Sequence, residues 1–346
     1  MVAAVEVEVE VAATKRDVMI MIASSIARYS HFRVLLALLA PCFAPIAFAQ
    51  NYPTKPVRMI VAFVPGGGAD IVARQFTPKL SRDFGQSFVV DNRGGAGGSI
   101  GAEIAAKAAP DGYTLFCASG SYAANAALYK PAFDAVTGIA PIVEVGFSPF
   151  IVSVHPSVPA KSIQELIALA RPKPGQLTYG SSGTGGITHL ATELMASMAK
   201  IKMVHIPYKA SSAALVDVIG GQVQLIVGSM LPTLPHVRAG KLRALAVTTA
   251  ERWPTTPEIP TVAESLPGYD VELWFGFWAP KGTPQSIVNR LNASVNKALH
   301  EADIKQNLEA GGLRASGGTA QKFAERIRKD VKRWEKVVAE IGLKPD

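Results

Sequence analysis

The stretch Ala62-Phe63-Val64-Pro65-Gly66-Gly67-Gly68-Ala69-Asp70-Ile71-Val72-Ala73-Arg74 decides the predicted fold. It overlaps the end of a short apolar, β-branched run over residues 57–64, which predicts a buried strand. Three glycines then let the backbone turn without a Cβ penalty, and Val72, Phe76 and Leu80 recur at steps of four, as on one face of a helix. A strand, a glycine turn and a helix in this order point backbone N–H groups and the positive helix end at one spot, which suits an anion.

The same unit of strand, glycine turn and helix recurs along the chain. The segment 87–91 predicts a second strand, which the glycine-rich turn 92–99 joins to the next helix, and the segment 113–117 predicts a third strand. Further on, a short strand at 177–181 meets a turn rich in Gly and Ser, in which Thr184 is a candidate N-cap. This rhythm predicts an α/β fold with parallel-rich sheets flanked by helices.

Two long apolar segments differ from these short strands. Residues 143–155 and 271–279 are extended and apolar, and we expect both to cross between two halves of the molecule. The second segment carries Trp274, Phe275 and Phe277. We expect some of these rings in the core and one of them beside a ligand pocket, because such pockets are largely apolar with few polar anchors.

The first 49 residues have the pattern of an export signal. A basic segment that includes Arg28 and Arg33 precedes the apolar run 34–48, and Ala47-Phe48-Ala49 forms an A-x-A cleavage site before Gln50. A membrane anchor is the alternative, but two prolines interrupt the run, and it is short for a span of about 20 residues. We therefore expect a periplasmic protein, exported by an N-terminal signal peptide that is cleaved after Ala49.

Composition and charge narrow the function classes. The chain has 346 residues, of which 49% are hydrophobic and 18% are charged, and this suits a globular protein with room for about two domains. Its net charge of +8 favours anionic partners. The sequence has no Lys/Arg block with interleaved aromatic residues, so no nucleic-acid partner is expected.

Cys117, in an apolar run, is expected to be a buried structural thiol.

Motifs for catalysis and cofactor binding are largely missing from the sequence. It lacks the P-loop, the G-x-G-x-x-G turn after its candidate strands and the H-E-x-x-H pattern, so no cofactor and no metal are expected. Gly180-Ser181-Ser182-Gly183-Thr184 resembles a nucleophile elbow but lacks the final glycine. An exported serine hydrolase that uses Ser182 or Ser181 with His189 stays an alternative. We favour a protein that is not an enzyme, in which His189 hydrogen-bonds locally and Asp70 orients its loop.

Short motifs follow one another over nearly all of the chain after residue 50. In chain order they include Tyr52-Pro53-x-Lys55-Pro56-Val57-Arg58, Pro65-Gly66-Gly67-Gly68-x-Asp70, Asn92-Arg93-x-Gly95-Ala96-Gly97-Gly98, Pro110-Asp111-Gly112-Tyr113-Thr114-Leu115, Gly183-x-Gly185-x-x-x-His189-Leu190, Pro207-Tyr208-Lys209 and Ala279-Pro280-x-Gly282-Thr283-Pro284. Each is weak alone. Together they resemble the Bug/TctC family of periplasmic solute-binding proteins, the receptors of tripartite tricarboxylate transporters.

The resemblance implies a two-domain periplasmic-binding-protein fold, similar to type II, with two crossover strands as a hinge. Domain 1 is then expected at 50–149 and 273–346 and domain 2 at 150–272, after an N-terminal extension and signal peptide at 1–49. It also implies that backbone N–H groups and waters from two loops hold a ligand carboxylate. The implied ligand-binding residues are Pro65, Gly66, Gly67, Gly68, Ala69 and Asp70 in one loop, Ser181, Ser182, Gly183, Thr184, Gly185 and Gly186 in the other, and Ser119 and Asn125 in a matching pocket-lining segment.

The implied function is the capture of a small organic carboxylate in an interdomain cleft and its presentation to the membrane subunits of a tripartite transporter. A ligand sensor for a membrane partner such as a sensor kinase, without transport, stays an alternative, and we expect a monomer. The chain has Gln224 where the family often has Asp, and Gly228 near the place of another frequent acid. The loss of these acids disfavours a ligand with an amino group, and tight binding of aspartate would contradict this hypothesis.

Overall fold

The computed structural model describes Met19, residues 52–129 and residues 133–344. The predicted signal peptide and its cleavage site lie outside the described residues. Residues 52–346 form one unit, which is separate from the first 51 residues. None of the described helices combines the length and the apolar character that crossing a bilayer requires.

Ten strands in the described residues form a mixed sheet in the order β2-β1-β3-β9-β4-β7-β5-β6, with β8 and β10 paired to β4. They are β1 (Val57–Val61), β2 (Phe88–Asn92), β3 (Thr114–Ser119), β4 (Ile139–Val154), β5 (Thr178–Ser181), β6 (Val204–Pro207), β7 (Leu225–Ser229), β8 (Arg243–Val247), β9 (Glu272–Pro280) and β10 (Arg314–Ala315). β1 pairs in parallel with β2 and β3, and β5 pairs in parallel with β6 and β7. The predicted α/β fold is confirmed, and its parallel strands fall into two groups.

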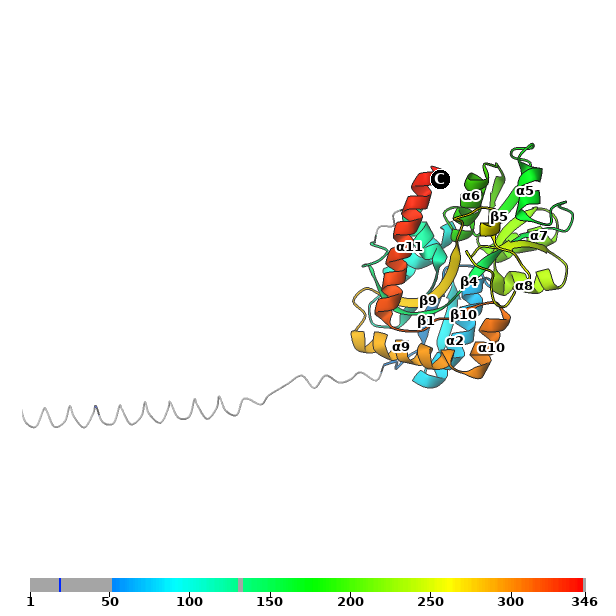
Figure 1. The fold of residues 1–346 in the computed structure, drawn as a ribbon. Coiled ribbons are helices and arrows are strands. Elements are labelled where there is room, and N and C mark those ends of the chain that lie inside the picture. Colours follow the sequence, from blue (N-terminus) through cyan, green and yellow to red (C-terminus); the bar gives the residue numbers. More distant parts are fainter. Residues whose placement is uncertain (1–18, 20–51, 130–132, 345–346) are drawn as a thin grey trace, which may run out of the picture. The chain divides into compact units, whose positions relative to one another are not determined.

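Helices alternate with these strands (Figure 1). The α-helices of the described residues are α2 (Gly68–Phe84), α3 (Ser99–Ala106), α4 (Gly120–Tyr129), α5 (Ile163–Ala170), α6 (Ile187–Ala199), α7 (Ser211–Ile219), α8 (Met230–Arg238), α9 (Gln285–Leu299), α10 (Ala302–Ala310) and α11 (Ala320–Ile341). Two short 3-10 helices are η1 (Ala96–Gly98) and η2 (Val262–Glu264). Each of β1, β3, β5, β6 and β7 leads into a helix, namely α2, α4, α6, α7 and α8.

The strands β4 and β9 join the two parallel groups. β4 is 16 residues long, and it pairs with β9 from Ile139 to Pro149 and with β7 from Phe150 to Val154. On its other side, β9 pairs antiparallel with β3. The two long strands expected from the sequence are confirmed, and the first begins earlier than expected, at Ile139. Since β4 belongs to both parts of the sheet, its bending would change how the two groups face each other.

The aromatic side chains of β9 are buried in the core. These side chains, each at most 1% exposed, are Trp274, Phe275, Phe277 and Trp278. The ring of Trp278 packs against that of Phe116 on β3, with ring centroids 4.6 Å apart. Cys117, the next residue of β3, is buried as expected, and burial raises the pKa of its thiol. The strands that bridge the two groups are therefore anchored in apolar packing.

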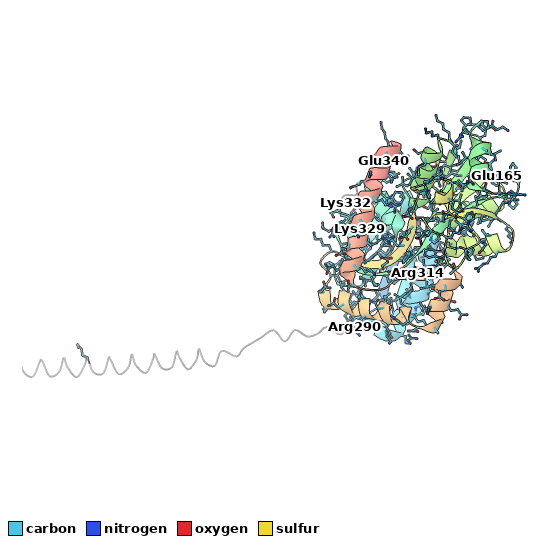
Figure 2. The ribbon with its side chains drawn as sticks, in the orientation of Figure 1. Glu165, Arg290, Arg314, Lys329, Lys332 and Glu340 are labelled. Atoms are coloured by element: carbon cyan, nitrogen blue, oxygen red, sulfur yellow. The ribbon has the colours of Figure 1, made fainter. Side chains whose placement is uncertain are left out.

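The C-terminal helix α11 covers part of this core. Thr319 caps its first turn by accepting a hydrogen bond from the Lys322 N–H at 3.2 Å. Phe323, Ile327 and Trp334 of its apolar stripe are buried, with Trp334 at 2% exposure. Lys329 and Lys332 lie on its outer, exposed face (Figure 2).

Candidate ligand-binding site

The first glycine turn joins β1 to α2 and is held by one buried carboxylate. Asp70, which is 2% exposed, accepts hydrogen bonds of 3.0 Å from the Gly66 N–H, from Nε of Arg74 and from Nδ2 of Asn92. Burial alone would raise the pKa of Asp70, but these hydrogen bonds outweigh it and hold the pKa below its ordinary value. Asp70 thus orients the turn, in agreement with the role expected for it.

The helix α2 begins with N–H groups that precede its first intrahelical hydrogen bond. This bond runs from the Ile71 N–H to the Gly67 carbonyl at 3.0 Å, so the N–H groups of Gly68 and Ala69 have no acceptor within the helix. A Cβ added at Gly68 would lie 2.7 Å from Cζ of Phe275 and 2.8 Å from Oγ of Ser229. Glycine at this position therefore lets a ring and a hydroxyl approach the start of the helix.

The Gly/Ser turn joins β5 to α6, and side chains from the first turn of that helix stabilise it. The Ser182 N–H donates to Oγ1 of Thr188 at 2.8 Å, and the Gly185 N–H donates to Nδ1 of His189 at 3.2 Å. The local hydrogen bond expected of His189 is confirmed. Since His189 accepts at Nδ1, its hydrogen bond fixes the backbone of the turn.

The prediction that Thr184 is the N-cap of the following helix is wrong. The helix α6 begins at Ile187, and its N-cap is Gly186. Gly183 and Gly185 have φ values of +110° and +71°, and these left-handed conformations carry the chain past Thr184 before the helix starts. The hydroxyl that stabilises the turn belongs to Thr188, inside the helix, and not to a residue in front of it.

A cavity of about 30 Å³ lies where the carboxyl ends of the two parallel groups meet. Its apolar wall consists of Phe63, Phe150, Ile187, Leu273 and Phe275. Its hydroxyl side chains are Ser119, Ser121, Ser182, Thr188, Ser211 and Ser229. The remaining lining residues are Gly67, Gly68, Ala69 and Ala210. This volume holds about two water molecules, so a larger ligand requires the walls to move apart.

Five helices begin at this cavity. For each of α2, α4, α6, α7 and α8, residues at or next to the helix start line the cavity. Each helix N-terminus carries a partial charge of roughly +0.5 and N–H groups without intrahelical acceptors. Their convergence favours an anion at this point. The cavity also lies at the carboxyl ends of parallel strands, the position at which open α/β sheets bind ligands.

The lining combines the apolar wall with polar groups that carry no charge. Among the described residues that surround the cavity, none is acidic or basic. The described residues also contain no group of three or more His, Cys, Asp or Glu that could hold a metal ion. The arrangement therefore offers neutral donors, namely hydroxyl and backbone N–H groups, set against an apolar wall.

The structure brings some of the predicted ligand-binding residues to the cavity. Those that line it are Gly67, Gly68, Ala69, Ser119 and Ser182. Those that do not line it are Pro65, Gly66, Asp70, Asn125, Ser181, Gly183, Thr184, Gly185 and Gly186. The side chain of Asn125 donates to the Ala96 carbonyl at 3.0 Å and borders a separate small hollow. Both turns therefore contribute residues to the cavity, but most of their residues shape the turn and do not line it.

Several lining residues were not predicted from the sequence. They are Phe63, Ser121, Phe150, Ile187, Thr188, Ala210, Ser211, Ser229 and Leu273. Ser211 and Ser229 stand where a parallel strand is followed by a helix. The same order of strand and helix predicts the glycine turns, so it could also have indicated these two residues from the sequence. Phe275 agrees with the expectation that one ring of the second crossover strand lies at a pocket.

The serine–histidine contacts differ from those that the hydrolase alternative needs. Oγ of Ser181 lies 2.6 Å from Nε2 of His205, not of His189, and Ser181 is fully buried. Oγ of Ser182 lies 3.0 Å from Oγ1 of Thr188. His189 stacks on His205 with ring centroids 3.8 Å apart. A nucleophile needs a base within hydrogen-bond reach and access to substrate, and a buried Ser181 lacks that access.

Solved structures of periplasmic binding proteins share this fold. The structure titled "R. palustris Rpa4515 with adipate" has a TM-score of 0.82 and 38% identity, and the match covers 85% of this chain and 100% of that chain. MatC from Rhodopseudomonas palustris with bound malate has a TM-score of 0.80 and 30% identity, over 83% of this chain and 100% of that chain. The fold and the site define an α/β protein of the periplasmic-binding-protein class.

Sequence comparisons narrow this class to a family. Residues 72–343 match the family described as "Tripartite tricarboxylate transporter family receptor", TctC. BugT of Bordetella pertussis is 36% identical over 305 residues, which are 87% of this chain and 93% of BugT. A UPF0065 protein of Pseudomonas sp. strain P51, from the tcbD-tcbE intergenic region, is 37% identical over 295 residues, or 84% of this chain and 88% of that protein. The chain belongs to the TctC family of receptors.

Proposed function

We propose that this protein is an extracytoplasmic solute-binding receptor that captures a small organic carboxylate in the cavity between the two turns. The observation that carries the proposal is the convergence of five helix N-termini on a cavity without charged side chains. Two relatives whose structures hold adipate and malate support the carboxylate class.

In this proposal, neutral donors hold the carboxylate. The N–H groups of Gly68 and Ala69 face it from the start of α2, and Ser119 and Ser182 face it from the neighbouring strand ends. The other residues of the two turns act indirectly, because they set the backbone conformation on which these donors depend. Hydrogen bonds to an ionised acceptor are roughly twice as strong as neutral ones, so a few such donors suffice.

Binding is coupled to movement of two domains. We assign 50–149 and 273–346 to domain 1 and 150–272 to domain 2, with β4 and β9 as the hinge. The pairing of β4 changes from β9 to β7 between Pro149 and Phe150, which supports a boundary at this point. Because a cavity of about 30 Å³ is too small for a dicarboxylate, the ligand enters an open form and the domains then close around it.

The remaining parts of the proposal concern location and partners. The signal peptide is cleaved after Ala49, and the mature protein acts in the periplasm as a monomer without enzymatic activity. It presents its ligand to the membrane subunits of a tripartite tricarboxylate transporter, and a sensor kinase is the alternative partner. A pull-down from solubilised membranes with the ligand-loaded protein distinguishes these two partners.

The test is a binding screen of the mature protein by thermal shift and titration calorimetry. The panel contains monocarboxylates, dicarboxylates, tricarboxylates and aromatic acids, with sulfate as an anion control. At least one carboxylate is expected to raise the melting temperature and to give saturable heat at one site, because a ligand that binds only the folded state stabilises it. A folded protein that responds to no carboxylate would overturn the proposal, and ester turnover that is lost in Ser182→Ala would favour the hydrolase.

A further inference from the structure

Ser229 presents a buried hydroxyl to the cavity. The residue is 4% exposed, and its Oγ has no hydrogen-bond partner among the described residues. It is the N-cap of α8, but its side chain does not cap that helix. A buried hydroxyl without a partner is costly, so one that lines a cavity is poised for a polar group that arrives with a ligand.

This hydroxyl lies directly opposite the start of α2. A Cβ added at Gly68 would come within 2.8 Å of Oγ of Ser229, although Gly68 begins the helix after β1 and Ser229 ends β7, in the other parallel group. A carboxylate that accepts from the N–H groups at the start of α2 is therefore within hydrogen-bond reach of Ser229. The O–H of Ser229 would donate to the carboxylate, and an O–H that donates to an anion forms a short, strong hydrogen bond.

The ring of Phe275 also lies against the start of α2, next to Ser229. Its Cζ would lie 2.7 Å from a Cβ at Gly68, and Phe150 and Leu273 continue the apolar wall beside it. The part of a ligand beyond its carboxylate thus meets aromatic and aliphatic carbon. Two carboxylates are sequence neighbours of lining residues, and neither lines the cavity: Asp70 is bonded to Arg74, Gly66 and Asn92, and Glu272 forms a 2.9 Å ion pair with Arg326.

An ammonium group has no anionic partner in this lining. To bury a charged group without a partner of opposite charge is expensive, whereas an apolar body gains from contact with the wall. We propose that Ser229 and Phe275 select the ligand of this site: an organic acid that carries no ammonium group, whose carboxylate accepts a hydrogen bond from Ser229 and whose apolar body lies against Phe275. This inference rests on the proposed carboxylate-binding function and names the class of acid.

The first test compares Ser229→Ala with a matched control. Thr233 lies on the next turn of α8, is 1% exposed and also has a hydroxyl without a partner among the described residues, but it does not line the cavity. In titration calorimetry with the best carboxylate of the screen, Ser229→Ala is expected to weaken binding about tenfold, as for the loss of one hydrogen bond to a charged group. Thr233→Val is expected to bind within twofold of the wild type. Equal affinities of Ser229→Ala and wild type would overturn the role of Ser229.

The second test uses pairs of acids that differ by one ammonium group. The pairs are succinate and aspartate, adipate and 2-aminoadipate, and 3-phenylpropanoate and phenylalanine. The acid without the ammonium group is expected to bind at least 100-fold more tightly in every pair that binds, and Phe275→Ser is expected to weaken the acids with longer apolar bodies most. If carboxylates bind but their amino counterparts bind equally well, the inference fails and the proposed function stands. If no carboxylate of any pair or of the wider screen binds, both fail.

Discussion

Gly97 and Gly183 meet backbone to backbone, so that a Cβ added at Gly183 would lie 3.2 Å from the Gly97 nitrogen. Gly97 belongs to the turn after β2 and Gly183 to the turn after β5, and these strands lie in different parallel groups. The contact therefore joins the two halves of the proposed receptor next to the cavity. It depends on the absence of side chains, because either Cβ would hold the turns apart.

The first prediction is that Gly97→Ala weakens ligand binding at least tenfold. An added Cβ would lie 2.7 Å from the Thr184 carbonyl oxygen and 2.8 Å from Nδ2 of Asn125, so the two turns could not close to their present distance. Titration calorimetry measures the effect. The control is Gly85→Ala, because Gly85 also has a positive φ, +68°, but an added Cβ would have no neighbour within 4 Å. The Gly85→Ala variant has the same backbone strain, about 1–2 kcal/mol for a left-handed residue, and should keep its affinity for the ligand. Equal losses of affinity in both variants would rule out a role for the contact between Gly97 and Gly183.

The second prediction concerns two adjacent glycines of the first turn. Gly68→Ala is expected to abolish or strongly weaken binding, because its Cβ would collide with Phe275 and Ser229 at the start of α2. Gly67→Ala is expected to weaken binding much less, because Gly67 also lines the cavity but its φ is −77° and the nearest atom to an added Cβ, the Val64 carbonyl oxygen, is 3.7 Å away. Overpacking at Gly68 is also expected to cost about 1–3 kcal/mol of stability. Calorimetry and melting curves of both variants check this, and it fails if the two substitutions have the same effect.

The third prediction concerns the dependence of stability on pH at Asp70. The folded-state pKa of Asp70 is lowered, so its ionised form stabilises the fold above the unfolded pKa of about 3.9, and this contribution is lost as the pH falls through the folded pKa. Asp70→Asn is therefore expected to reduce the free energy of unfolding by about 1–3 kcal/mol at pH 7, and the difference from wild type should shrink at acidic pH. Urea unfolding at pH 7, 5 and 3 measures it. A difference that does not change with pH would mean that the charge of Asp70 is not what stabilises the turn.

The fourth prediction concerns Glu144 on β4, whose pKa is shifted in the opposite direction to that of Asp70. This side chain is 5% exposed, and burial raises its pKa, although Arg326 and Lys322 partly offset the shift. A raised folded pKa favours folding below the unfolded pKa of about 4.3, and this contribution is lost as the pH rises through the folded pKa. Glu144→Gln is thus expected to melt at a higher temperature than wild type at pH 7, with a smaller gain at pH 4. The control Glu272→Gln removes a 2.9 Å ion pair with Arg326 and should not stabilise the protein; stabilisation by both variants would point away from burial as the cause.

The turns were predictable from the sequence because their signals are local. Gly67 and Gly68 mark the start of α2, and the apolar run ahead of them marks β1, without reference to any distant residue. The long strands were also recognisable, since an extended apolar run rich in β-branched and aromatic residues is typical of a strand that is buried on both faces. The fold class follows from these local units and their order.

The composition of the cavity wall was much harder to predict. Phe275 stands opposite Ser119 because of the register in which β9 pairs with β3, and Phe150 stands opposite Ser229 because of the register in which β4 pairs with β7. Between these pairings, β4 and β9 pair with each other, and their register shifts between Pro141 and Val143 and between Glu144 and Gly146. A shift of one residue turns every later side chain to the other face, and such shifts leave no clear mark in the sequence. The N-cap of α6 was also hard to predict, because the turn between β5 and α6 runs on to Gly186 and the sequence does not show where it ends.

The meeting of five helix ends has a consequence for how such a receptor diversifies. The attraction for an anion comes from the peptide backbone, so exchanging a side chain of the apolar wall does not remove it and no side-chain titration switches it off. Residues such as Phe150, Leu273 and Ser211 can be exchanged without touching that attraction. Gene copies of one receptor can therefore drift from one acid to another while each intermediate still captures a solute.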